Sequence, residues 1–346
     1  MPRADGNNKR NTAAVENMKA RRSETILKYN GVEITPSITG FSLELSAEGT
    51  ADNCSFEIAD RGERWMGALF PKKGDTVEVK IFVYDWEGNG DNRSLSCGTF
   101  TVDSAGISGE AVTVSVGAVA KPATAAFSAT QRTQTWQNAT LKKIAETIAG
   151  RYQLNLFYDA AEILILAKEQ SEQEDGAFLQ ELCQTYGLIL KIYRDKLVIF
   201  DREGYKKKNP VKTISRFEIK REAGWNYQTD LEGSYTGGII TYTDAKTEKD
   251  ISYEVGTQER PLKLNEQADS LGDAKRKLEA AIANANHDLF RLSFSVMGNP
   301  DLVDGVVLEI VDFGVEISGR YFVDKAVHSL SRGDGYVTAL EMSKII

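Results

Sequence analysis

The sequence has few of the residues on which catalytic and metal sites commonly depend. It contains three cysteines, Cys54, Cys97 and Cys183, an odd number without a Cys-x-x-Cys spacing, and two histidines, His287 and His328. Such cysteines are expected to be small buried hydrophobes in a reducing compartment rather than disulfides. A zinc site or a histidine base would have to use one of only two histidines, so both kinds of site are disfavoured.

Site motifs are missing as well. No nucleophile elbow, P-loop or dinucleotide fingerprint occurs, so His328 within a strand and His287 at a helix end are expected to serve packing. The segment Asp85-x-Glu87-x-Asn89-Gly90 opens like a calcium loop, but Ser96 stands at the twelfth position, where an EF-hand requires glutamate. The sequence therefore predicts no catalytic, cofactor-binding or metal-binding residues, and a protein that is not an enzyme.

Charge and hydropathy exclude further classes. The formal net charge is −8, whereas binding to a nucleic acid duplex depends on Lys and Arg that neutralise phosphates. No apolar run approaches the roughly 18 residues that span a bilayer, and the N-terminus lacks the apolar core of a secretory signal. We therefore expect a soluble protein made in the cytoplasm, without a membrane span and without a small-molecule substrate.

One strand signature occurs twice in the chain. Gly98-Thr99-Phe100-Thr101-Val102-Asp103 and Gly319-Arg320-Tyr321-Phe322-Val323-Asp324 both fit Gly-x-aromatic-x-Val-Asp. Each copy follows a glycine, Gly74 or Gly305, that opens a β-rich run, and each precedes a further strand-like run. We interpret each copy as a meander of antiparallel strands with one buried face, and the shared order of flanking elements indicates an internal duplication.

The two copies differ in length. Gly74 and Gly98 are 24 positions apart, whereas Gly305 and Gly319 are 14 apart. The additional positions fall around Tyr84–Arg93, a polar, glycine-rich stretch that is typical of a hairpin tip. We expect this insertion, Tyr84 to Ser96, to lie at a contact that only one of the two units makes with a neighbouring subunit.

Pattern changes divide the chain into four segments. Residues 1–24 are polar and basic and are expected to form a flexible arm, and residues 25–120 have strand patterns throughout. Residues 121–205 form an α/β insertion and a linker that ends near Lys206-Lys207-Lys208, a run expected to be solvated. Residues 206–346 return to strands and contain one long helix.

Apolar residues that recur at helical spacing predict three helices. The apolar positions that recur at this spacing are Leu141, Ile144, Ala145 and Ile148; Phe178, Leu179, Leu182, Cys183 and Tyr186; and Leu271, Ala274, Leu278, Ala281, Ile282 and Ala285. Ser171-x-x-Glu174 has the form of a capping box and predicts where the second helix begins, and Gly187 predicts its end. The fold class is therefore mainly β with an α/β insertion.

Several runs together resemble the late control protein D family of phage baseplate hub proteins. They are Phe56–Arg61, Phe70–Asp75, Gly98–Asp103, Thr140–Ala145, Phe178–Gly187, Gly298–Gly305, Gly319–His328 and Gly335–Thr338. The resemblance covers about residues 25–346. It implies two tandem similar antiparallel β-barrel domains of the tail-tube type, at residues 25–120 and 206–346, with the small α/β domain outside them.

The resemblance also implies a function and partners. It implies a structural homotrimer whose six β domains form a pseudo-sixfold ring, a symmetry adaptor between the sixfold tail tube, or its initiator protein, and the trimeric central spike. The chain ends at Ile346 without a needle segment, so a separate spike protein is expected among the other baseplate proteins. Assembly would occur in the bacterial host cytoplasm, and the mature location would be the tail baseplate of a phage or a tail-derived bacteriocin.

Two alternatives from other classes stay open. A tail-associated cell-wall hydrolase would need a cleft with carboxylates of perturbed pKa, and the 50 acidic residues make proximity in sequence uninformative. A glycan-binding tail module would need an exposed aromatic platform. The four tryptophans are too scattered to predict one, at Trp65, Trp86, Trp136 and Trp225.

Overall fold

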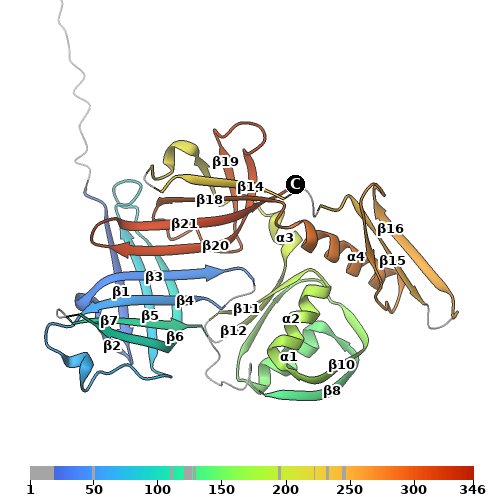
Figure 1. Cartoon of the computed structure of the whole chain (residues 1–346), viewed down its shortest axis with the longest axis horizontal. Coiled ribbons are helices and arrows are strands. Elements are labelled where there is room, and N and C mark those ends of the chain that lie inside the picture. Colours follow the sequence, from blue (N-terminus) through green and yellow to red (C-terminus); the bar gives the residue numbers. More distant parts are fainter. Residues whose placement is uncertain are drawn as a thin grey trace, which may run out of the picture.

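The structure is a computed structural model, and the residues it describes are 19–48, 51–109, 112–120, 127, 130–193, 196–221, 223–230, 234–243 and 247–346. Most of the expected N-terminal arm lies outside the described residues, and the first strand already begins at Arg22. Figure 1 shows a large sheet, an α/β body beside it and a smaller helix-and-strand layer at the far end. Among the described helices, none combines the length and apolar composition needed to cross a membrane.

The large sheet has 13 strands, and its main path runs β14-β18-β21-β20-β3-β4-β7-β6-β5-β1-β2; off this path, β19 pairs with β20 and β13 pairs with β19. Its strands are β1 (Arg22–Tyr29), β2 (Val32–Glu33), β3 (Ile38–Ser46), β4 (Asn53–Ala59), β5 (Thr76–Tyr84), β6 (Arg93–Ser108), β7 (Thr113–Val119), β13 (Lys212–Ser215), β14 (Trp225–Thr229), β18 (Phe290–Met297), β19 (Val307–Val311), β20 (Gly319–Ser331) and β21 (Gly335–Lys344). We call β1–β7 the first unit and β13, β14 and β18–β21 the second unit.

The expected fold class, mainly β with an α/β insertion, is confirmed. The two units, however, share one open sheet, and neither closes into a barrel within the described residues. The reason is an antiparallel pairing between β3 of the first unit and β20 of the second, which merges the two meanders edge to edge. Figure 1 shows the second unit, in red and yellow, lying directly above the blue strands of the first.

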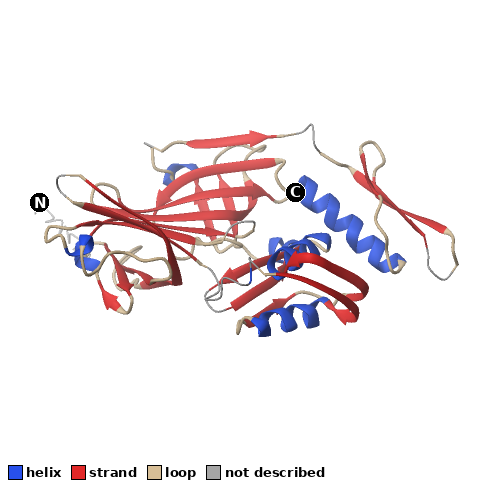
Figure 2. Ribbon diagram, turned by 60° about the horizontal axis from the view of Figure 1, so that its bottom comes forward, coloured by secondary structure: helices blue, strands red, loops and turns tan. Residues whose placement is uncertain are grey.

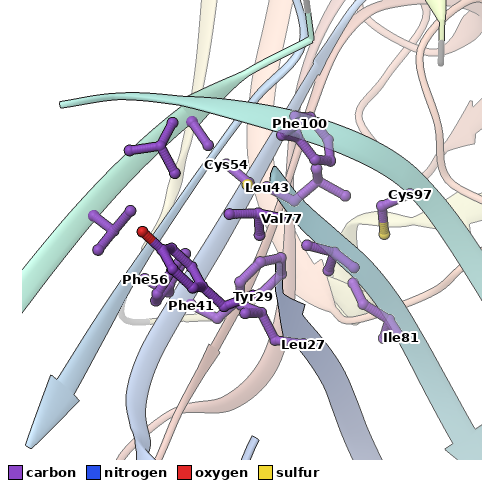
Figure 3. Close-up of a cluster of buried hydrophobic side chains, with 14 of the residues drawn as sticks. Leu27, Tyr29, Phe41, Leu43, Cys54, Phe56, Val77, Ile81, Cys97 and Phe100 are labelled. Atoms are coloured by element: carbon purple, nitrogen blue, oxygen red, sulfur yellow. The ribbon is translucent and has the colours of Figure 1, made fainter. Parts of the chain in front are cut away.

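Alternation of apolar side chains gives the first unit its core. On β5, Val77, Val79, Ile81 and Val83 are buried while the residues between them are more exposed, the period-2 pattern of a strand with one face inward. Figure 3 shows Val77 among aromatic and aliphatic side chains from four other strands. The Asn30-Gly31 turn predicted from the sequence joins β1 to β2, with both residues at positive φ.

The α/β body lies between the main sheet and the far layer. It contains β8 (Gln131–Thr140), α1 (Leu141–Arg151), β9 (Asn155–Asp159), β10 (Leu164–Glu174), α2 (Asp175–Thr185), β11 (Leu188–Tyr193), β12 (Lys196–Asp201) and α3 (Arg202–Lys206). The predicted apolar face of α1 is confirmed, because Leu141, Ile144, Ala145 and Ile148 are all buried. Gly187, at φ 69°, follows the end of α2 as predicted.

The predicted capping box at Ser171 is wrong. Strand β10 continues through Ser171 to Glu174, and the Glu174 side chain makes no capping hydrogen bond to α2. A bulge between Gln170 and Gln173 lets β10 stay paired with β8 across this polar stretch. The carboxylate that matters is the next one: Asp175 is fully buried and accepts hydrogen bonds from Arg151, Tyr152 and Gln170.

The long predicted helix, α4 (Leu271–Asn286), forms a layer of its own rather than part of a second barrel. It packs on a three-stranded sheet of β15 (Gly237–Thr243), β16 (Asp250–Gly256) and β17 (Pro261–Leu264), with Ala274 and Leu278 buried between them. Figure 2 shows α4 between this sheet and the α/β body. Two hydrogen bonds tie α4 to the segment at the end of α2, Tyr186 to Asp273 and Asn284 to Gln184.

Candidate assembly site at the junction of the two β units

The repeated signature has the same geometry in both units. Gly98 and Gly319 both have positive φ, 104° and 136°. Phe100 and Tyr321 stand opposite Val77 and Leu308 on the preceding strand, and both aromatic rings are buried. Each copy then has a β-bulge directly after its valine, so Asp103 and Asp324 are skipped in the pairing with the next strand.

The glycines that open the two units are equivalent too. The Gly74 amide donates to the Val102 carbonyl at 3.1 Å, and the Gly305 amide donates to the Val323 carbonyl at 2.8 Å. In return, the amides of these valines donate to the residue after each glycine, at 2.8 and 2.9 Å. Matching bulges and matching hydrogen bonds confirm the internal duplication.

Strand order extends the correspondence beyond the signature. The first unit runs β3-β4-β7-β6, and the second runs β14-β18-β21-β20. The next strands, β5 and β19, are also equivalent, but β1 pairs antiparallel with β5 whereas β13 pairs parallel with β19. Two copies of one meander are therefore joined in a single chain, with differences at one outer edge.

The junction between the units is a buried antiparallel pairing. It places Leu43 opposite His328 and Leu45 opposite Ala326, and all four side chains are buried. Nδ1 of His328 lies 2.8 Å from the Tyr336 hydroxyl. Burial lowers the pKa of His328 to about 4, so its imidazole is neutral at neutral pH and serves packing, as the sequence predicts.

The other histidine contacts a signature aspartate. Nε2 of His287 lies 2.7 Å from Oδ1 of Asp324, and the Ser343 hydroxyl donates to Oδ2 of the same carboxylate at 2.6 Å. The carboxylate therefore stands between the serine and the imidazole. Nucleophilic activation needs the hydroxyl bonded to the base itself, so this arrangement is not a catalytic triad.

The insertion of the first unit clamps onto the second unit of the same chain. Trp86 is buried against the Tyr336 ring at a centroid distance of 5.8 Å, and its indole Nε1 donates to the Gly298 carbonyl at 2.6 Å. Arg93 binds Asp301 at 2.6 Å on the same segment. We call this set the tryptophan clamp. The expected contact of the insertion with a neighbouring subunit stays a prediction.

The sequence predicts the insertion as a hairpin tip at a subunit contact, and it does not single out Trp86 as an anchor within the chain. The available signal was a single large apolar residue within an otherwise polar stretch. The acidic side chains of the tip serve the turn itself: Asp85 accepts from the Gly90 amide at 2.7 Å, and Asp91 accepts from the Glu87 amide at 2.9 Å. Among the described residues, no group of three or more His, Cys, Asp or Glu side chains is placed to hold a metal ion.

Replacing Gly298 with alanine is expected to loosen the clamp. An added Cβ would overlap the Tyr336 ring, so the ring and the indole above it must shift. Overpacking of this kind costs about 1–3 kcal/mol of unfolding free energy, measurable by urea titration. Gly150→Ala in α1 is the matched control, because nothing lies near its Cβ position, and an equal loss in both variants would contradict the argument.

A buried charge network joins the α/β body to both units. Nζ of Lys191 on β11 lies 2.9 Å from Asp52 and 2.6 Å from Asp304, and Asp52 also accepts from the Ser46 amide. Burial, together with the charge of Asp304, raises the pKa of Asp52 to about 6 against the opposing effect of Lys191. Burial alone would lower the pKa of Lys191, but the two carboxylates raise it. Three segments thus meet at one ammonium group.

One face of the shared sheet carries rows of residues that cross both units and, apart from Glu57, are all serine or glycine. Cross-strand partners in two such rows are Ser329-Ser42-Ser55-Gly117-Ser104 and Ser331-Gly40-Glu57-Ser115-Gly106. These rows line a hollow of about 730 Å³. The result is a smooth, polar strip that passes without interruption over the junction. We call it the serine strip.

The remaining sequence candidates lie in cores or at edges. All three cysteines are free and buried, as expected, and burial raises the pKa of Cys183 to about 12. Trp65 and Trp136 are buried in separate cores, whereas Trp225 is 46% exposed on the edge strand β14. The lysine run is not simply solvated, because Lys206 is buried and paired with Glu203 at 2.7 Å.

Comparison with known proteins shows which class of fold this arrangement belongs to. No family model and no curated protein matches the chain. Its fold is that of a tail protein from Neisseria meningitidis MC58, with a TM-score of 0.71 and 16% identity over 93% of this chain and 96% of that one. A 43 kDa tail protein of prophage MuSo2 from Shewanella oneidensis aligns with a TM-score of 0.67 and 14% identity, over 92% and 97% of the chains.

A third similar structure comes from a secretion system. It is an E. coli component of the type VI secretion system, with a TM-score of 0.58 and 10% identity, covering 92% of this chain and 77% of that one. The chain therefore has the fold of phage tail and type VI secretion proteins. Identities this low establish the fold, and the late control protein D resemblance is carried by the sequence runs alone.

Proposed function

We propose that this chain is a structural baseplate hub of a contractile injection system. Three copies would form a ring of six similar β units that joins the sixfold tail tube to the trimeric central spike. The observation that carries the proposal is the duplicated unit, matched in bulges and turn hydrogen bonds and held in one shared sheet. The fold shared with solved tail proteins supports the same role.

The duplicated unit would allow three copies of the chain to form a ring with pseudo-sixfold symmetry. Closed rings need a contact that repeats, and a chain with two similar units offers six similar surfaces from three copies. The two units are free to differ where threefold partners bind. Here they do differ: only the first unit has the insertion, and β13 replaces β1 at the outer edge of the second.

The serine strip supports a position beside a passage. Apart from the exposed Glu57, the two rows consist of serines and glycines, which expose little apolar area, so material can move past them without sticking. The strip crosses the junction of the units and therefore follows the shared sheet from one unit into the next. A wall of this kind suits the inner face of a ring.

The partners we propose are two further copies of the chain, a separate central spike protein, the tail tube or its initiator, and other baseplate proteins. The role is non-enzymatic, and membership of the late control protein D family belongs to the same proposal. Assembly would take place in the host cytoplasm, and the mature location would be the tail baseplate of a phage or phage-tail-like particle.

Light scattering and negative-stain imaging of the purified chain test the proposal, first alone and then with the spike and tube proteins encoded beside it. We expect trimers that appear as rings once the spike is present. A chain that stays monomeric with both partners would count against the hub. An assay on purified peptidoglycan tests the non-enzymatic role, which turnover abolished by a single carboxylate substitution would overturn.

A further inference from the structure

Two stretches of strand edge lack the partner that their counterparts have. In the second unit, β20 pairs with β21 on one side, and with β19 and then β3 on the other. In the first unit, β6 pairs with β5 only as far as Thr101, and from Ser104 to Ser108 that side meets no strand among the described residues. The equivalent half of β20 is where the second unit receives β3.

The missing half of this contact lies at the other end of the sheet. Strand β14 pairs with β18 alone in the described part of the chain, whereas its counterpart β3 lies between β4 and β20. The first unit therefore offers an edge that β14 fits, and the second unit offers β14. A chain cannot close both edges on itself in this arrangement, but a second copy can.

The registers within the chain fix how the edges would match. Leu43 stands opposite Cys54, which faces Ala118, and Ala118 faces Val102. In the second unit, Tyr227 stands opposite Leu292, Met342 and then Val323 in the same succession, so Tyr227 is the counterpart of Leu43. The signatures likewise align Ile107 with His328, the partner of Leu43.

Exposure distinguishes the two free edges from the closed junction. At the junction, Phe41, Leu43, Leu45, Ala326 and His328 are buried. Their counterparts are less covered: Trp225 and Thr229 on β14 and Ala105 on β6 are exposed, and Tyr227 and Ile107 are half-buried. Positions that are covered inside the chain are thus less covered at its two ends.

Composition shows that neither edge is protected against pairing. Natural edge strands commonly carry lysine, proline or inward charges that prevent another strand from adding. The Ser104–Ser108 and Trp225–Thr229 stretches contain no charged residue and no proline, and the second is rich in side chains that favour strands. An unprotected edge in a native protein indicates a strand that pairs on assembly.

Exposed apolar residues beside these edges repeat the clamp arrangement. The turn between β19 and β20, counterpart of the insertion tip, exposes Val315 at 87%. The segment between β4 and β5, counterpart of the segment that receives Trp86, exposes Met66 and Phe70. A copy-to-copy contact with the geometry of the internal junction would bring these two apolar groups to the same side.

We propose that β14 of one copy pairs antiparallel with the second half of β6 of the next copy. The register places Tyr227 opposite Ile107, Thr229 opposite Ala105 and Asp230 opposite Ser104. The occupant of both edges is a second copy of this chain, and the contact extends the shared sheet and the serine strip from copy to copy. This inference rests on the proposed hub function and specifies its ring contact.

Disulfide trapping of the full chain under mild oxidation tests the register. Two double variants carry the matched pairs Ala105→Cys with Thr229→Cys, and Ser104→Cys with Asp230→Cys. Antiparallel pairs alternate between wide and narrow Cα spacing, so one of two adjacent pairs has the spacing that a disulfide prefers. The native cysteines are buried, and the unsubstituted chain gives the background.

The matched control is a register slip of one residue, Ala105→Cys with Asp230→Cys. A slip puts the two side chains on opposite faces of the sheet, so we expect roughly tenfold less crosslinked product than in a matched pair. Equal crosslinking in matched and slipped pairs, or none in either matched pair, overturns the inference. Trapping collects even transient contacts, so a weak association still yields product.

The size of the product separates this inference from the hub proposal. A double variant can bond on both sides, so a closed ring of three gives a ladder on a non-reducing gel that stops at the trimer. A matched-pair ladder that continues past three supports the register but contradicts the trimeric hub. Trimers seen by light scattering without matched-pair crosslinks support the hub but overturn the register.

Discussion

Replacing Trp86 with alanine is expected to lower the free energy of unfolding by about 3–5 kcal/mol, the usual cost of removing a buried large aromatic side chain. The indole fills the space between the insertion and Tyr336, and its Nε1 hydrogen bond satisfies the buried Gly298 carbonyl. The variant leaves both a cavity and an unpaired acceptor. Urea unfolding monitored by circular dichroism measures the loss.

Trp225→Ala is the control of the same residue type. Trp225 is 46% exposed and meets the Phe313 ring edge-on at a centroid distance of 5.2 Å, so its removal should cost about 1 kcal/mol. Limited proteolysis shows where the chain loosens: Trp86→Ala should speed cleavage within Asp85–Asn92, and Trp225→Ala should not. Equal stability losses in the two variants would show that Trp86 does not anchor the insertion.

Short-range pattern was sufficient for the units themselves. The glycine, the buried aromatic residue and the valine of the signature are local requirements of a turn, an inward position and a strand, so they can be recognised twice without a structure. The same holds for α1, whose face follows from spacing alone. The bulges also fall at equivalent positions of the two signatures, because Asp103 and Asp324 each directly follow the valine.

Long-range contacts are where sequence reasoning stopped. The junction pairs Leu43 with His328, and the clamp joins Trp86 to Gly298. These residues lie more than 200 positions apart in the sequence, and local periodicity gives no information about such contacts. An apolar strand predicts a buried face but not which strand covers its edge. Two closed barrels and one shared sheet therefore have the same local pattern, and only the pairing of β3 with β20 decides between them.

Predictions from short sequence motifs also failed where strand pairing or buried contacts favoured a different local structure. Ser171 satisfies the capping pattern, yet pairing with β8 keeps it in a strand, and the buried Asp175 network fixes where α2 begins. Helix α4 forms where its spacing predicts it, with Ala274 and Leu278 of the predicted face buried, but Leu271 and Ala285 are exposed and the partners of the helix were not predicted. Its close approach to Gly187 through Ala280 depends on two small residues far apart in sequence.

Replacing Lys191 with methionine is expected to cost about 3–5 kcal/mol at pH 7, because it leaves the buried Asp52 without a counter-charge. Methionine keeps most of the length of the side chain, so the loss reports charge rather than volume. The double variant Lys191→Met with Asp52→Asn should recover part of the stability, since a neutral amide needs no counter-charge while Asp304 still lacks its ammonium partner. Thermal unfolding of both variants against the native chain measures the difference.

The pH dependence of the unfolding free energy gives a second, independent test of the same network. Because the pKa of Asp52 is raised to about 6 from its ordinary 3.8, the folded state binds this proton more tightly than the unfolded state does. The contribution of Asp52 to stability is therefore largest below about pH 4 and is lost as the pH rises to about 6, by about 3 kcal/mol in all.

Asp52→Asn should remove that slope, so the stability of the native chain minus that of the variant should fall as the pH rises from about 4 to about 6. Lys191→Met should extend the fall to higher pH, because the ammonium group no longer favours the ionised carboxylate. A difference between the native chain and Asp52→Asn that stays constant across this window would show that Asp52 is ionised throughout. Such a result would mean that the Lys191 ammonium group offsets the burial of Asp52, so that a fully charged ion pair joins the α/β body to both units.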